Sequence, residues 1–167
     1  MTSVWGPACW DVFHGWCLSA WRAGDDEQAK RFYTSFVHLL RCFVCKKHYI
    51  QMIREHPPDT TSLEALFAWT VDRHNETNQR LGKPWFRVED AWIRYVAMTE
   101  KWVKVQTDFY DIVRRAPKNH LLDWKLFCFW WAALGLHQQK PIGPSIALAL
   151  AILLLVLLFI LVVWLLV

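Results

Sequence analysis

The sequence predicts an all-α protein with four main helices, a short fifth helix and a C-terminal transmembrane helix. Apolar residues recur at spacings of three and four through most of the first 104 residues, which is the period of an amphipathic helix. No stretch shows the convincing alternation of a half-buried strand, and residues 145–167 form an uncharged apolar run. We therefore expect a helical domain over residues 1–104, a tether over 105–144 and a membrane anchor over 145–167.

The first two helices are predicted over residues 6–22 and 27–41. Pro7 suits the first turn of the first helix. Its apolar stripe consists of Trp10, Phe13, Cys17 and Trp21. The segment Gly24-Asp25-Asp26 ends this pattern and places acidic side chains near the start of the second helix, where the helix dipole favours them.

Three further helices are predicted over residues 43–55, 63–80 and 89–104. The third helix ends at His56-Pro57-Pro58, because a residue before proline avoids the helical conformation. Ser62 is a suitable N-cap for the fourth helix, which ends before Gly82. The fifth helix is shorter than the fourth.

The expected tether, residues 105–144, is polar at first and has a loop at Pro117 and Asn119. Residues 126–136 are apolar but too few to cross a bilayer. We expect them to form a helix that lies at a membrane interface or packs on the domain.

Residues 145–167 are expected to form the anchor. As a helix this run would be about 35 Å long, which exceeds a hydrocarbon core of about 30 Å. The sequence before it shows no leader and carries several basic residues, so we expect the helical domain to face the cytosol. The net charge of +4 comes from scattered residues, and no nucleic-acid partner is expected.

Only two of the five cysteines have a spacing that suggests chemistry: Cys42 and Cys45. A C-x-x-C pair forms either a disulfide or half of a metal site. At the start of a helix, a thiolate is stabilised by free backbone N–H groups. The alternative to a redox disulfide is a zinc-binding, membrane-anchored interaction module with the ligands His38, Cys42, Cys45 and His48.

Polar and aromatic residues on two other helices are expected to converge on this pair: Trp10 and His14 on one, and Trp69, His74, Asn75 and Asn78 on the other. Aromatic rings could stack on a planar cofactor, and the imidazoles and amides could hydrogen-bond to ribose or phosphate. A zinc site gives these residues no role.

Taken together, these motifs resemble the Erv/ALR family of FAD-dependent sulfhydryl oxidases. The resemblance covers roughly residues 5–95 and rests on three motifs: Gly6-x3-Trp10-x3-His14, Cys42-x2-Cys45-x2-His48, and Trp69-x4-His74-Asn75-x2-Asn78 followed by Leu81-Gly82-Lys83-Pro84. It implies a four-helix bundle with a short fifth helix that binds FAD at its mouth.

The resemblance also implies residue roles. Cys42 would exchange with an outside dithiol, and Cys45 would pass the electrons to the flavin. Molecular oxygen would reoxidise the flavin and yield hydrogen peroxide, with no metal required. The expected cofactor-binding residues are Gly6, Trp10, His14, Cys45, His48, Trp69, His74, Asn75, Asn78, Lys83 and Trp92.

The chain departs from many family members because it has no second C-x-x-C motif and no further cysteine pair that braces the last helices. In this it is most like the small oxidases of large DNA viruses. The analogy implies a dithiol protein substrate or thioredoxin-like carrier, and a virion or viral-factory membrane. The family also forms homodimers through its first helices, where Trp16, Leu18 and Trp21 suggest surplus apolar surface.

Overall fold

The computed structural model describes residues 2–115 and 124–136, and within these ranges every regular element is a helix. The predicted all-α class is therefore confirmed. The elements are α1 (Thr2–Ser19), α2 (Asp26–Ser35), the 3₁₀ helix η1 (Phe36–Leu39), α3 (Phe43–Glu55), α4 (Leu63–Arg80), α5 (Val88–Thr99), α6 (Trp102–Arg115) and α7 (Trp124–Ala133).

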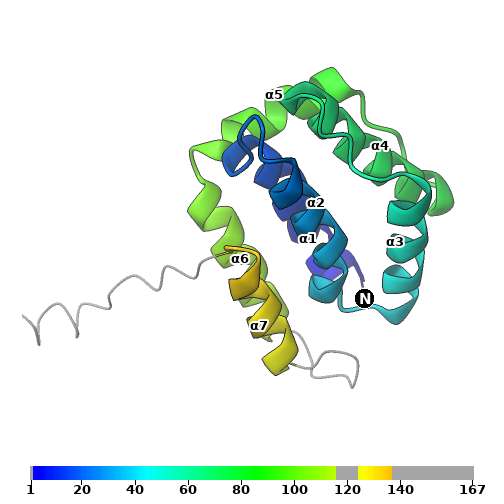
Figure 1. The fold of residues 1–167 in the computed structure, drawn as a ribbon. Coiled ribbons are helices and arrows are strands. Elements are labelled where there is room, and N and C mark those ends of the chain that lie inside the picture. The colour runs from blue at the N-terminus through cyan, green and yellow to red at the C-terminus, as the bar shows by residue number, and fades with distance from the viewer. Residues whose placement is uncertain (1, 116–123, 137–167) are drawn as a thin grey trace, which may run out of the picture. The chain divides into compact units, whose positions relative to one another are not determined.

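Helix α1 lies at the centre of the described helices and packs against α4, α5 and α6 (Figure 1). Phe13 on α1 is fully buried in a cluster of aromatic rings. Its ring neighbours are Trp10, His14, Tyr33, Phe36, Tyr49 and Trp69. The Tyr33 hydroxyl on α2 also donates a hydrogen bond to the Phe13 carbonyl at 3.2 Å, which ties α2 to α1.

Local sequence signals account for two of the helix starts. The Asp25 carboxylate accepts a hydrogen bond from the Gln28 amide at the start of α2, and the Ser62 hydroxyl accepts one from the Ala65 amide at the start of α4. The bounds of α3 and α4 agree with the prediction. Helix α2 is shorter than the helix predicted over residues 27–41. After Ser35 the chain tightens into η1, and at Leu40 it becomes extended.

The segment expected to begin a polar tether instead forms α6, which packs on α1. Gln106, Phe109 and Val113 are buried at helical spacing beneath a polar outer face. A close approach at Gly15 makes this packing possible, because a Cβ atom there would lie 2.6 Å from the Trp102 ring. Helix α6 thus crosses the expected domain boundary at residue 104.

Helix α7 packs on the domain through Phe127 and Trp131, which are both buried. Trp130 on its flank stacks on the ring of His38 with centroids 4.1 Å apart. Of the two alternatives for residues 126–136, the structure shows packing on the domain.

Two other expectations concern surface and membrane. Trp16 and Trp21 are 3% and 7% exposed, and Trp16 stacks on Phe32, so these rings do not provide the surplus apolar surface expected for a dimer. No helix in residues 2–115 or 124–136 combines the length and apolar character needed to span a bilayer. The predicted anchor, residues 145–167, lies outside the described residues.

Candidate active site

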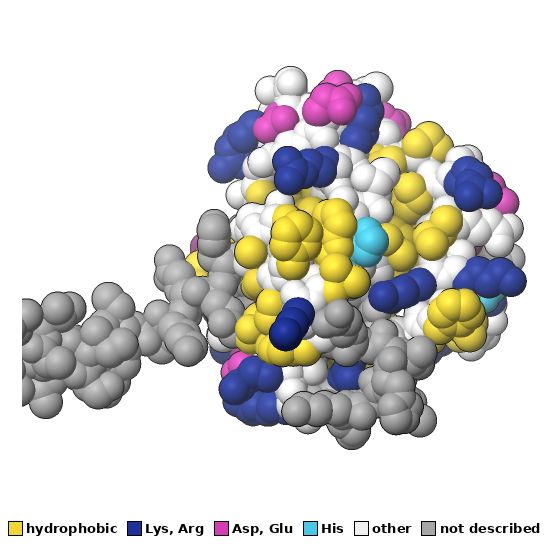
Figure 2. Space-filling view, turned by 60° about the horizontal axis from the view of Figure 1, so that its bottom comes forward, with side chains coloured by type: hydrophobic (Ala, Val, Ile, Leu, Met, Phe, Trp, Pro, Cys, Tyr) yellow, Lys and Arg dark blue, Asp and Glu magenta, His cyan; other side chains and the backbone are white. Residues whose placement is uncertain are grey.

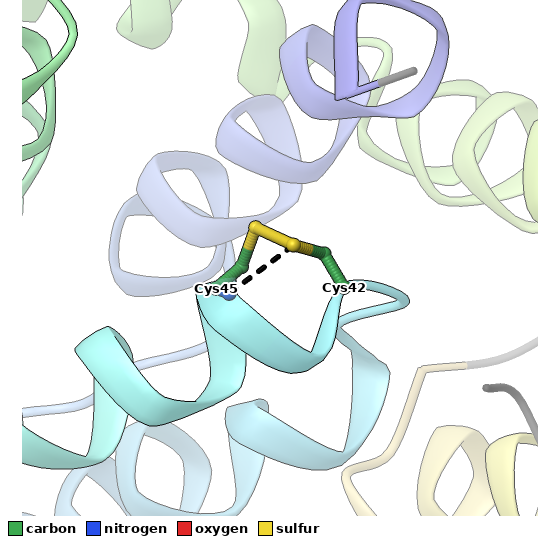
Figure 3. The surroundings of a disulfide bond; sticks show 2 residues. All are labelled: Cys42 and Cys45. Carbon is green, nitrogen blue, oxygen red and sulfur yellow. Dashed lines mark hydrogen bonds between the residues drawn. A yellow bond between two sulfur atoms is a disulfide. The ribbon is translucent and has the colours of Figure 1, made fainter.

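Cys42 and Cys45 form a disulfide at the start of α3 (Figure 3). Their Cα atoms are 5.0 Å apart. Cys42 is the N-cap residue, and its sulfur accepts a hydrogen bond from the Cys45 amide at 3.2 Å. This bond and the positive end of the helix dipole would also stabilise a thiolate at Cys42 after reduction.

A cavity of about 1160 Å³ lies beside the disulfide, lined by residues of α1, η1, α3, α4, α5, by Leu40 and by the loop over residues 81–86. Its volume is slightly above the range of about 300–1,000 Å³ that is usual for small-molecule sites. Cys45 lines this cavity, whereas Cys42 does not. The two cysteines are therefore placed differently: Cys45 belongs to the cavity wall, and Cys42 does not.

The cavity brings together seven of the residues predicted to bind a cofactor: Gly6, Trp10, Cys45, His48, His74, Asn78 and Lys83. The Trp10 and His74 rings stack nearly parallel, at 8° and with centroids 4.0 Å apart. An extended aromatic wall is a suitable surface for a planar ring system.

From His74 in this wall, a buried hydrogen-bonded chain leads inward to His14 and Thr70. His14 Nδ1 lies 2.8 Å from Thr70 Oγ1, and His14 Nε2 lies 2.9 Å from His74 Nδ1. Because the Thr70 hydroxyl donates to the Phe67 carbonyl at 2.6 Å, its oxygen accepts the proton of His14 Nδ1. Neutral His14 then accepts a hydrogen bond from His74 Nδ1, which leaves His74 Nε2 as an acceptor.

Burial keeps both imidazoles neutral. It lowers the pKa of His74 from 6.5 to about 4, and the positive charges of Lys83 and Arg94 act in the same direction. Burial also lowers the pKa of His14 well below its usual value, helped by His74 and Arg94. Both imidazoles are therefore uncharged at neutral pH.

The two asparagines predicted to bind the cofactor both hold a loop through their side-chain amides. The Asn75 side chain donates to the Phe86 carbonyl at 2.9 Å and accepts from the Phe86 amide at 2.8 Å. The Asn78 amide donates to the Pro84 carbonyl at 3.1 Å. Both residues thereby fix the loop that contributes Lys83, Pro84, Trp85 and Phe86 to the cavity.

Four predicted residues do not line the cavity: His14, Trp69, Asn75 and Trp92. Trp69 is buried beside Phe13, and its indole N–H donates to the His56 carbonyl at 3.0 Å. Trp92 packs edge-on against Phe67. The direct contact of Trp69 and Trp92 with a cofactor stays a prediction. Their packing against Phe13 and Phe67 is observed.

Sequence reasoning missed several residues of the wall: Trp5, Tyr49, Trp85, Phe86, Arg94 and Tyr95. The Trp85-Phe86 pair follows directly after the Lys83-Pro84 motif, which could have indicated it. Tyr95 donates a hydrogen bond to Asp11 at 3.3 Å, and this α1–α5 contact gives no signal in the sequence.

The alternative zinc site finds no support in this geometry. The sulfurs of Cys42 and Cys45 are bonded to each other, and His38 stacks on Trp130. Among the described residues, no three His, Cys, Asp or Glu side chains lie close enough together to hold a metal ion.

Comparison with known proteins places the site in a family. The family model described as "Erv1 / Alr family" matches residues 7–102, which is more than half of the chain. The mitochondrial FAD-linked sulfhydryl oxidase ERV1 of Saccharomyces cerevisiae is 32% identical over 97 residues, which cover 52% of this chain and 51% of the yeast protein. The chain thus spans about half the length of this relative.

A second relative is viral and similar over most of its length. The FAD-linked sulfhydryl oxidase of African swine fever virus (isolate Pig/Kenya/KEN-50/1950) is 25% identical over 113 residues, which cover 63% of this chain and 92% of the viral protein. No solved structure matches the chain significantly. From the family match, which includes the disulfide and most of the cavity wall, it follows that this chain belongs to the Erv1/Alr family.

Proposed function

We propose that this protein is an FAD-linked sulfhydryl oxidase that forms disulfide bonds in protein thiols and passes the electrons to molecular oxygen. One observation carries the proposal: the redox disulfide has Cys45 on the wall of a large aromatic cavity and Cys42 outside it. The names of the yeast and viral relatives support the same activity.

The cavity fits FAD in its chemistry. Aromatic rings such as Trp10 suit the flat ring systems of this cofactor, and basic side chains such as Lys83, Arg80 and Arg94 suit its diphosphate. When bound, FAD accepts two electrons from the reduced cysteine pair and transfers them to oxygen, which yields hydrogen peroxide.

The two cysteines carry out the exchange with substrate. A substrate thiolate attacks the Cys42 sulfur, the Cys42–Cys45 bond breaks, and Cys45 leaves as a thiolate on the cavity wall. The second substrate thiol, as its thiolate, then attacks the substrate sulfur of this mixed disulfide and releases Cys42 as a thiolate. The hydrogen bond from the Cys45 amide stabilises this leaving group. The substrate leaves as a disulfide, and the two electrons that it has given up remain on the reduced Cys42 and Cys45.

Oxygen consumption with dithiothreitol tests this proposal. The purified protein should consume oxygen and form an equal amount of peroxide, and Cys42→Ser and Cys45→Ser should each abolish this activity. Bound zinc in elemental analysis, together with a colourless protein that consumes no oxygen, would contradict the proposal.

The proposal extends to location and assembly. The uncharged run over residues 145–167 supports a membrane anchor, and the basic residues before it, such as Lys125 and Lys140, favour a cytosolic catalytic domain. The similarity to a virus protein supports a virion or viral-factory membrane. We also propose a homodimer, as the family resemblance implies. Light scattering of the detergent-solubilised chain, corrected for bound detergent, should give the mass of two chains, and one chain would contradict the dimer.

A further inference from the structure

The outer face of α3 carries a stripe of apolar and basic residues that begins at the redox disulfide. Phe43, Lys47, Ile50 and Arg54 follow one another at spacings of four, three and four, which places them on one side of the helix. All four are exposed, Phe43 by 68% and Ile50 by 49%. We call these four residues the α3 stripe. The opposite side of α3 is occupied by the buried Tyr49 and Met52.

The α3 stripe is positively charged without a balancing acid. Between Phe36 and Arg54 the sequence has no Asp or Glu. In the described part of the chain, neither Lys47 nor Arg54 forms an ion pair with a carboxylate within 4.0 Å. The nearest acid in sequence, Glu55, accepts a hydrogen bond from Gln51 at 2.9 Å. The stripe therefore offers positive charge and apolar surface together.

The space-filling view shows the kinds of side chain on one face of the domain. Figure 2 turns forward the lower side of Figure 1, where α3 begins. On this face, hydrophobic side chains lie next to Lys and Arg side chains, and most of the Asp and Glu side chains gather at one edge.

The position of the disulfide determines what must cover this stripe. For exchange, a substrate sulfur must reach Cys42, and Cys42 is joined directly to Phe43 at the first residue of α3. A protein substrate docked on Cys42 therefore also covers the start of the α3 stripe. A membrane surface laid on the same face would block access to Cys42, so a protein is the occupant that this position favours.

From this geometry, and resting on the proposed oxidase function, we propose that the α3 stripe is the docking surface for an acidic dithiol protein. The partner presents carboxylates and apolar side chains beside its cysteine pair. The carboxylates pair with Lys47 and Arg54, and the apolar side chains cover Phe43 and Ile50. Complementary charge of this kind raises the association rate and selects the partner, while the chemistry at Cys42 stays unchanged.

Matched peptides test the proposal on the full-length FAD-bound protein in detergent. Two synthetic helical peptides have the same C-x-x-C pair and the same leucines, but one has four glutamates where the other has four lysines. We expect kcat/KM for oxygen consumption to be about tenfold or more higher with the acidic peptide at low salt, and this preference to fade as salt is added.

The double variant Lys47→Glu/Arg54→Glu should reverse the preference, with unchanged kcat/KM for dithiothreitol. A matched variant with the same change in net charge, Lys101→Glu/Lys104→Glu at the start of α6, should keep the wild-type preference. Absence of a preference, or a preference that survives the Lys47→Glu/Arg54→Glu change, would overturn the proposal.

Two further outcomes identify the alternatives. The first would show that the stripe binds a membrane, and the second would show that the protein has no oxidase activity. If the Lys47→Glu/Arg54→Glu variant loses binding to phosphatidylserine vesicles but keeps the peptide preference, the stripe serves a membrane and the proposal fails. If even dithiothreitol supports no oxygen consumption by the wild-type protein, the oxidase function itself fails, and that result differs from a missing peptide preference.

Discussion

Asn75 offers a direct test of how α4 shapes the cofactor site. Its side chain is 5% exposed and makes two hydrogen bonds to the backbone of Phe86. Asn75→Ala removes both bonds. Each contributes about 0.5–1.5 kcal/mol net, so we expect a loss of about 1–3 kcal/mol in the free energy of unfolding.

The same change should weaken FAD binding although Asn75 does not line the cavity. The loop that it holds supplies Lys83 and Trp85 to the wall. A loop that must become ordered on binding lowers affinity, and we expect an increase of about tenfold in the dissociation constant. Flavin fluorescence titration gives this constant, and urea denaturation of the FAD-free protein gives the stability.

The two measurements together distinguish a loop clamp from a direct contact. Asn75→Asp keeps the acceptor for the Phe86 amide and loses the donor, so its stability should lie between that of the wild type and Asn75→Ala. Asp72→Ala, at an exposed position on the same helix, should change stability by less than about 0.5 kcal/mol. If Asn75→Ala weakened FAD binding but left the FAD-free protein as stable as the wild type, the clamp would be refuted.

Three other predictions concern the buried histidine, the α1 glycines and the topology. The pKa of His74 is lowered from 6.5 to about 4, so only the unfolded chain takes up this proton between these values, and stability should fall as the pH drops through that window. Urea denaturation of the FAD-free protein measures the free energy of unfolding at pH 7 and at pH 4. Between these pH values the free energy of unfolding should fall less in His74→Gln than in the wild type, by on the order of 3 kcal/mol. Equal decreases in the two proteins would contradict this. Gly15→Ala should lower the free energy of unfolding by about 1–3 kcal/mol, because the new methyl group overlaps the Trp102 ring. Gly6 lies on the cavity wall with open space around it, so Gly6→Ala should stabilise the FAD-free protein and weaken FAD binding. In intact membranes an N-terminal tag should be digested by protease without detergent, and a protected tag would place the domain in a lumen.

The sequence predicted the elements whose ends are set by local chemistry. Helix α3 ends before Pro57, and α4 begins after its N-cap Ser62, so both ranges agree with the structure. Helix α1 starts four residues earlier than predicted, because Pro7 lies inside the helix and not in its first turn. Helix α6 was missed because its polar composition hid the inward-facing residues Phe109 and Val113.

The site was predictable where it depends on spacing within one helix. Cys45 and His48 on α3 reach the cavity as expected, and so do Trp10 on α1 and His74 on α4. The role of Asn75 was not predictable, because its partner is a backbone segment whose position depends on the loop after α4. The contact of Trp69 with a cofactor stays a prediction from its place in the motif, and its ring packs beside Phe13.

The central claim is that Cys45 delivers electrons to a flavin in the adjacent cavity. Mixing the purified protein with dithiothreitol in the absence of oxygen tests it most directly, with flavin absorbance as the signal. We predict a yellow protein whose flavin bands bleach in the wild type and regain their intensity when oxygen is admitted. Cys45→Ser should retain the flavin but not bleach on the same timescale. A protein without flavin bands, or equally rapid bleaching in Cys45→Ser, would contradict the claim.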